Sequence, residues 1–296
     1  MGHEDIVSLL LEQPTVAPDC KSAAYYGHTK CVRLLLDHAQ RSYRDEKGGN
    51  VACIAALAGA TEVLEELIKW SDIEFDPTTG VEGVSTLEAA LKAQSEEAAL
   101  ILIPYSDANP VYSCGDRPLN LAAKVKSIES VRLLFSQNIS VNARGIHGHT
   151  ALHNAAVMRN EDMIDLILSH PDIDISICDN DGNTPLMAFL QCPLGMKRVT
   201  LRSSKMFLSS SELDINAQNP SGDTALLIAA SMEGRYYPEE DEDIFMAFLK
   251  SCRCTQRAQK QAWSNNPNHC YSGRLTEGSN HCGGNASVIS IQRGRR

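Results

Sequence analysis

The sequence of 296 residues is poor in aromatic side chains, which make up only 5% of it, and it contains no long apolar run. A helix that crosses a bilayer needs roughly 18–20 consecutive apolar residues, so we expect no membrane span. The first residues, MGHEDIVSLLLEQ, carry acids where a secretion signal would carry basic residues. We therefore expect a protein of the cytoplasm or the nucleus that is not secreted.

Catalytic motifs are also missing. The sequence has no motif for an activated nucleophile, a phosphate-binding glycine loop or a zinc-binding pair of helical histidines. Its ten cysteines lie at irregular spacings, which favours reduced thiols in a chain without a secretion signal. We therefore expect neither an enzyme nor a cofactor.

The charge is unevenly distributed. The net charge is −10, which argues against general binding of nucleic acid or of an anionic membrane. Residues 251–296 contain seven basic residues and one acid, so they carry +6 and the preceding residues −16. This basic segment has no sustained apolar periodicity, and we expect a disordered tail.

A zinc site in the tail is the alternative that we rank below free thiols. The candidate ligands are Cys252, Cys254, His269, Cys270, His281 and Cys282. Their arrangement as C-x-C followed by adjacent His-Cys pairs differs from the usual C-x₂-C spacing of zinc sites.

What the sequence does contain is an internal repeat. The copies begin at Pro18, Asn50, Ser85, Arg117, Thr150, Thr184 and Thr224. Successive starts are 32, 35, 32, 33, 34 and 40 residues apart, a period that is typical of stacked repeat proteins. An insert near 192–212 accounts for the interval of 40 residues, and a second insert, at 235–243, separates the two helices expected in the seventh unit.

A unit of about 33 residues with Thr-Pro-Leu-His, paired alanines and a Leu-rich run resembles the ankyrin repeat. The best copies include GHTALHNAA (148–156), DGNTPLM (181–187) and SAAYYGHTKCVRLLL (22–36). The resemblance covers residues 1–250 and implies an all-α repeat solenoid, with two antiparallel helices and a β-hairpin or turn finger in each unit. The chain begins within a repeat, which indicates a degenerate cap or a longer parent protein.

The residues at the repeat starts have a structural interpretation. Threonine before a helix accepts a hydrogen bond from a free backbone N–H. Proline at the first helical position has no N–H, but an N–H there would have no partner within the helix, so no hydrogen bond is lost. The residues with this signature are Thr150, His153, Thr184, Pro185, Thr224 and Pro118. His153 lacks a recognisable nucleophile or orienting carboxylate, so we interpret it as bracing a helix start, as the resemblance implies, and not as a catalytic base.

The resemblance also implies a surface for a protein partner, formed by finger tips and exposed positions of the first helices. Matching the repeats selects Tyr25, Tyr26, Glu46, Lys47, Ile146, His147, His149, Val157, Met158, Asn180, Asp181, Asn183, Pro220, Ser221 and Asp223. Tyrosine is a common interface anchor, although Tyr25 and Tyr26 could equally contact the neighbouring repeat. We expect a monomeric, non-enzymatic interaction module or scaffold.

Three other hypotheses remain open. The chain could be a regulatory or targeting fragment of a longer ankyrin-containing enzyme, such as a kinase, or a decayed copy without a stable partner. Asn216 in LSSSELDIN matches the hairpin sequence that asparaginyl hydroxylases modify in some ankyrin proteins. For Asn216 we rank a structural hydrogen bond within the finger first.

Overall fold

In the computed structural model, the residues described are 4–12, 20–38, 50–70, 75, 84–191, 201–210, 212–231, 276–278 and 288–290. The chain divides into two compact regions, an N-terminal region Met1–Asn180 and a C-terminal region Asp181–Arg296, which are described separately. Among the described helices, none has the length and apolarity needed to cross a membrane.

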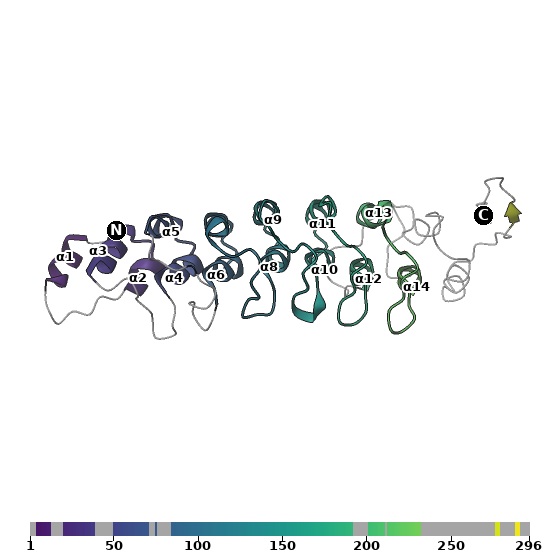
Figure 1. The fold of residues 1–296 in the computed structure, drawn as a ribbon, viewed down its shortest axis with the longest axis horizontal. Coiled ribbons are helices and arrows are strands. Elements are labelled where there is room, and N and C mark those ends of the chain that lie inside the picture. The colour runs from purple at the N-terminus through teal and green to yellow at the C-terminus, as the bar shows by residue number, and fades with distance from the viewer. Residues whose placement is uncertain are drawn as a thin grey trace, which may run out of the picture. The chain divides into compact units, whose positions relative to one another are not determined.

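The N-terminal region is built from short helices in two layers (Figure 1). The first helices of the repeats are α2 (Cys20–Tyr25), α4 (Val51–Ala58), α6 (Thr86–Lys92), α8 (Pro118–Val125) and α10 (Ala151–Val157). The second helices are α1 (Glu4–Leu11), α3 (Thr29–His38), α5 (Thr61–Ile68), α7 (Glu96–Leu102), α9 (Ile128–Phe135) and α11 (Glu161–Leu168). Its described residues also include two short 3-10 segments, η2 (Ile103–Tyr105) and η3 (Ile146–Gly148).

Neighbouring repeats pack side by side within each of the two layers. Each first helix contacts the next first helix, and each second helix contacts the next second helix. Helix α1 packs against α3 and so occupies the place of a second helix. The all-α repeat solenoid expected from the sequence is confirmed by this arrangement, because each repeat is covered by its neighbours.

The alanine pairs explain how the first helices approach one another. Ala55, Ala122 and Ala155 are completely buried, and no side-chain atom beyond Cβ holds the neighbouring helix away. The second helices contribute larger apolar side chains to the core, such as Leu134 and Ile167, which are also completely buried. Burial of each such side chain contributes about 1.5–3 kcal/mol.

The finger, the loop that leads from a second helix to the next first helix, turns sharply at glycine. Gly148 has a φ of +74°, which side chains rarely adopt. A Cβ atom there would lie 2.4 Å from both Arg144 Nη2 and Asn180 Oδ1. Gly148 is therefore required both for the turn and for the close approach of the next finger.

Asparagine side chains connect neighbouring loops at the base of the fingers. Asn109 donates to the carbonyl of Asn138 (2.7 Å) and accepts from the amide of Ser140 (2.8 Å). Asn142 repeats both bonds one unit later, with the carbonyl of Asp172 (2.7 Å) and the amide of Asp174 (2.8 Å). These bonds hold each finger in register with the next.

The C-terminal region contains α12 (Pro185–Gln191), α13 (Leu201–Ser209), α14 (Ala225–Ser231), β1 (Thr276–Gly278) and β2 (Val288–Ser290). Helix α12 contacts α14, and β1 pairs with β2 in antiparallel orientation. These strands are the only described residues of the tail expected to be disordered, so that expectation stays a prediction for the remainder.

Helix α13 differs from the prediction of an insert over 192–212. Phe207 is completely buried and its ring centre lies 5.8 Å from that of Phe189 in α12. Ser204, three residues earlier on the same side of the helix, is also completely buried. One large apolar side chain thus anchors a helix whose serines and basic residues suggested a loop. The segment 235–243 lies outside the described residues.

Candidate functional site

Thr150 and His153 form a reciprocal cap at the start of α10. Thr150 Oγ1 accepts from the amide of His153 (3.4 Å), and His153 Nδ1 accepts from the amide of Thr150 (3.2 Å). The exposed fractions of the two residues are only 1% and 0%. His153 is therefore enclosed in the fold, where a substrate has no access to its ring.

The same position caps other first helices. The Thr184 hydroxyl accepts from the amide of Met187 (3.4 Å), and the Thr224 hydroxyl from that of Leu227 (3.3 Å). Pro118 and Pro185 are the first residues of α8 and α12, where a missing N–H costs no helical hydrogen bond.

We expect Thr150→Val to lower the free energy of unfolding by about 1–2 kcal/mol, because valine keeps the shape but removes the capping oxygen. Urea denaturation followed by circular dichroism measures the change. Thr61→Val is the control, since Thr61 lies inside the first turn of α5 and is not its cap. Equal losses in the two variants would contradict a capping role for Thr150.

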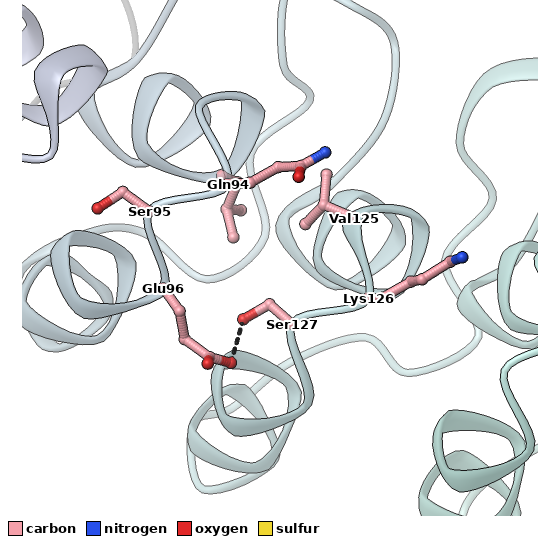
Figure 2. A pocket seen from close by; sticks show the side chains of 7 residues that line it. Gln94, Ser95, Glu96, Val125, Lys126 and Ser127 are labelled. Carbon is pink, nitrogen blue, oxygen red and sulfur yellow. Dashed lines mark hydrogen bonds between the residues drawn. The ribbon is translucent and has the colours of Figure 1, made fainter.

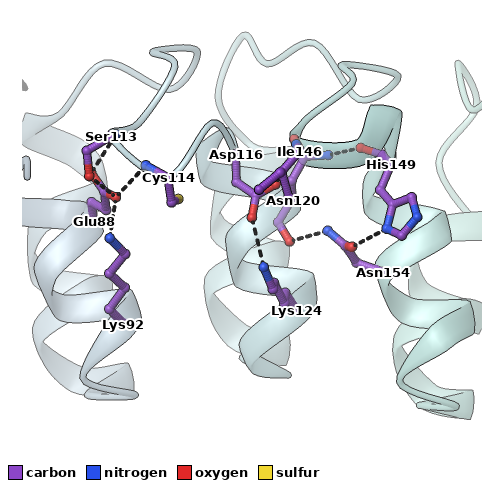
Figure 3. Close-up of polar contacts among 10 residues, drawn as sticks. All are labelled: Glu88, Lys92, Ser113, Cys114, Asp116, Asn120, Lys124, Ile146, His149 and Asn154. Atoms are coloured by element: carbon purple, nitrogen blue, oxygen red, sulfur yellow. Dashed lines mark hydrogen bonds and ion pairs between the residues drawn. The ribbon is translucent and has the colours of Figure 1, made fainter. Parts of the chain in front are cut away.

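Glu88 joins its own helix to the next finger (Figure 3). Its side chain is completely buried and accepts from the amide (3.1 Å) and hydroxyl (2.8 Å) of Ser113, the amide of Cys114 (3.3 Å) and Nζ of Lys92 (2.7 Å). Burial alone would raise the pKa of Glu88, but the hydrogen bonds from Lys92 and Ser113 outweigh it, so this pKa is lowered. Glu88 is therefore an ionised structural anchor.

Asp116 has the same role in the following repeat. Its buried carboxylate accepts from the amide of Ile146 (3.0 Å) and pairs with Nζ of Lys124 (3.3 Å). Figure 3 shows the two arrangements side by side on neighbouring repeats. We call Glu88–Lys92 and Asp116–Lys124 the finger clamps, because each links a lysine to the following finger through one carboxylate.

His149 belongs to a polar chain between repeats. Its Nδ1 lies 3.3 Å from Asn154 Oδ1, and its Nε2 lies 3.7 Å from Asp179 Oδ2. Its ring stacks on the ring of His153, with the ring centres 5.5 Å apart. Asn120 donates to its carbonyl (2.9 Å). The His149 side chain is thus half-buried, with 22% exposed, and is held by contacts between repeats; its place on a partner-binding surface stays a prediction.

The other predicted surface residues of the N-terminal region vary in exposure. Tyr25 and Tyr26 are 56% and 69% exposed and lie edge to face, with ring centres 5.3 Å apart. Ile146 is 38% exposed and His147 lies beside it at the finger tip. The remaining members are Val157 and Met158, half-buried; Asn180, exposed; and Glu46 and Lys47, outside the described residues.

In the C-terminal region, one predicted surface residue is buried. Asn183 is only 8% exposed, and its Oδ1 accepts a hydrogen bond from Asn219 (3.1 Å), so it braces two fingers from inside. The others are exposed or half-buried: Asp181, Pro220, Ser221 and Asp223. Asn216, the residue singled out for hydroxylation, is half-buried, and its modification stays a prediction.

Sequence reasoning overlooked Leu57, Lys92 and Lys124. Leu57 is 42% exposed on α4, and the two lysine side chains are 39% and 42% exposed on α6 and α8. Each lies seven residues after its repeat start, as do Tyr25 and Val157. The repeat period itself could have identified all five, which we call the first-helix row.

Sites for small molecules and metals find little support in the described residues. A shallow pocket of about 200 Å³ lies between the turns after α6 and α8, where Glu96 accepts from the Ser127 hydroxyl at 2.8 Å (Figure 2). Ligand pockets usually hold about 300–1,000 Å³. The described His, Cys, Asp and Glu residues form no metal-binding group of three. The six candidate zinc ligands of the tail lie outside these residues.

The described cysteines lack the signs of a nucleophile. Those that the structure describes, Cys20, Cys31, Cys53, Cys114 and Cys178, are reduced thiols. Burial raises the pKa values of Cys31 and Cys114, which keeps both protonated at neutral pH.

Stacked helix pairs joined by fingers define a helical repeat protein of the kind that presents an extended face. The family model for ankyrin repeats matches residues 22–114, 52–145 and 86–179, which together make up more than half of the chain. The chain therefore belongs to the ankyrin repeat family, as the repeat pattern predicted.

Sequence relatives match over short stretches. Rabankyrin-5 of Mus musculus is 38% identical over 71 residues, which is 24% of this chain and 6% of that protein. A putative ankyrin repeat protein of Rickettsia bellii is 43% identical over 60 residues, 20% of this chain and 62% of that protein. The chain thus matches only a small fraction of the length of Rabankyrin-5.

Solved structures show the same fold at low identity. The human ASB11 ankyrin repeat domain aligns with a TM-score of 0.60 at 17% identity, covering 78% of this chain and 96% of that one. The Bcl-3 ankyrin repeat domain aligns with a TM-score of 0.62 at 16% identity, covering 80% and 100%.

Proposed function

We propose that this protein is a non-enzymatic interaction module that binds another protein through its first helices and finger tips. Ankyrin repeats are generally protein–protein interaction modules. The observation that carries the proposal is the exposed, edge-to-face pair of Tyr25 and Tyr26, since rigid aromatic side chains lose little entropy on binding.

The finger tips extend this face. Ile146 exposes apolar surface. Backbone hydrogen bonds hold the tip, from the amide of Gly145 to the carbonyl of His149 (2.8 Å) and from the amide of Asn180 to the carbonyl of His147 (2.9 Å). A preorganised surface binds with a smaller ordering cost than a mobile one. We further propose that the protein acts as a monomer in the cytoplasm or nucleus. Its origin as a fragment of a longer enzyme stays a hypothesis.

We expect Tyr25→Ala/Tyr26→Ala to lose most partner binding, because hot-spot tyrosines each contribute at least about 2 kcal/mol. The measurement is affinity capture from cell extract with the intact chain as bait, quantified by mass spectrometry. The control is Tyr105→Ala, since Tyr105 is 55% exposed but lies in η2, after a second helix. Partners retained by the double variant, or lost equally in the control, would contradict the proposed face.

A further inference from the structure

Resting on the proposed function, we propose that the first-helix row binds an extended acidic protein segment with an apolar anchor. The row reads Tyr25, Leu57, Lys92, Lys124 and Val157. Its first two members are exposed and apolar, and the next two are exposed cations. A partner that follows the row from α2 to α8 must therefore change from apolar to acidic.

The members of the row lie on neighbouring helices at equivalent positions. Contacts run from α2 to α4, from α4 to α6 and from α6 to α8. Figure 3 shows Lys92 and Lys124 in corresponding places on helices α6 and α8. Each also lies in a finger clamp, so the adjacent finger is fixed relative to the lysine that borders it.

The clamps leave both lysines available to a partner. An ammonium group has three donors, and each Nζ gives one to its buried carboxylate. Glu88 and Asp116 are completely buried and are also satisfied by finger amides. A partner carboxylate can thus approach the solvent side of each lysine without meeting an exposed acid on the same helix.

The finger after α9 contributes one further cation. Arg144 of the finger donates to the carbonyl of Gly148 (3.2 Å) and to Asn180 Oδ1 (2.9 Å), both neutral acceptors. The second helices carry charges of both signs: Glu96 and Glu97 lie in α7 and three acids in α11, whereas α3 contains Lys30 and Arg33 and α9 contains Arg132. The described loops also carry exposed acids, namely Asp107, Asp172, Asp174 and Asp181. Helices α4, α6 and α8 carry no exposed acid, so the cationic part of the surface is confined to Lys92 on α6 and Lys124 on α8.

Repeat spacing sets the pattern of the partner. Packed helices lie roughly 8–10 Å apart, and an extended chain advances about 3.3–3.6 Å per residue. About three partner residues therefore span one repeat. We expect an apolar residue opposite Leu57, an acid about three residues further along opposite Lys92, and a second acid about three residues beyond it opposite Lys124.

The test selects peptides from a random, phage-displayed dodecapeptide library on the intact chain. We expect enrichment of sequences with an apolar residue and two acids at three-residue spacing. A synthetic peptide of the selected sequence is then titrated by fluorescence anisotropy. We expect Lys92→Gln/Lys124→Gln to weaken binding about fivefold to tenfold at low salt, the combined effect of two exposed ion pairs, with less effect at 1 M salt.

Lys69→Gln/Arg132→Gln is the matched control. It removes the same charge from two cations that pair with Glu66 and Glu129 outside the first helices. Circular dichroism checks that both double variants remain folded. Equal weakening by the two double variants would overturn the assignment of the lysines.

The remaining outcomes separate this inference from the proposed function. Selected peptides that lack acids but need Tyr25 and Tyr26 would overturn the acidic pattern and leave the interaction face intact. Absence of any selected peptide, with tyrosine-dependent capture still seen, would overturn an extended partner alone. Displacement of the acidic peptide by a polyuridine oligonucleotide, regardless of the tyrosines, would indicate a general polyanion site and also overturn the inference.

Discussion

Glu88→Ala is expected to lower the free energy of unfolding by about 3 kcal/mol, because it breaks a buried, hydrogen-bonded ion pair. The substitution leaves the amides of Ser113 and Cys114 and the ammonium of Lys92 without their shared acceptor. Urea denaturation measures the loss, and amide hydrogen exchange at Ser113 and Cys114 locates it. If hydrogen exchange at these two amides were as slow in the variant as in the unchanged protein, the role of Glu88 in holding the finger would be contradicted.

The effect should depend on pH in a defined direction. The pKa of Glu88 is lowered in the folded protein, so its stabilisation is fully present above the unfolded pKa of about 4.3 and is lost as the pH falls through the folded value. The difference in stability between the protein and its Glu88→Gln variant should therefore shrink in acid. Glu129→Ala is the control; this carboxylate is 60% exposed, and we expect a change below about 1 kcal/mol.

Phe207→Ala is expected to cost about 3–5 kcal/mol in the C-terminal region, because it removes a completely buried aromatic side chain packed on Phe189. Thermal and urea denaturation measure the loss. A solvated insert would tolerate the change almost without cost, so this variant decides between a loop and a packed helix over Leu201–Ser209.

The adjacent Leu208 supplies the control for Phe207. Leu208 is half-buried in the same helix, so Leu208→Ala should cost clearly less. Equal costs in the two variants would mean that general helix propensity, and not the contact with Phe189, determines the stability of α13.

The repeat period predicted most of the fold because the physical requirements recur. The oxygen that caps α10 at Thr150 and the alanines that let helices approach return at the same register in several repeats. Helix α13 escaped prediction because its apolar residues Met206, Phe207 and Leu208 follow one another and do not recur at helical spacing. The serines around these residues suggested a loop, although the segment is a packed helix.

The candidate site was harder to predict because exposure depends on contacts between repeats. His149 and Asn183 lie at finger positions that matched the surface pattern, but their side chains reach polar partners in neighbouring segments. Glu88 follows its repeat start by three residues, as His153 follows Thr150. The repeat pattern gives no sign that the Glu88 carboxylate reaches two amides 25 and 26 residues away. Finding Lys92 and Lys124 in the sequence requires counting seven residues from each repeat start.

The hydrogen bonds of Asn109 and Asn142 at the base of the fingers constrain which insertions and deletions the sequence can accept. Asn109 and Asn142 each reach the loop one repeat further on, so removal of residues 110–142 would bring Asn109 opposite Asp172 and Asp174. A deletion of a few residues more or fewer would place another side chain there and break both bonds. Duplication or loss of one whole repeat is therefore the insertion or deletion that preserves the asparagine hydrogen bonds of these loops.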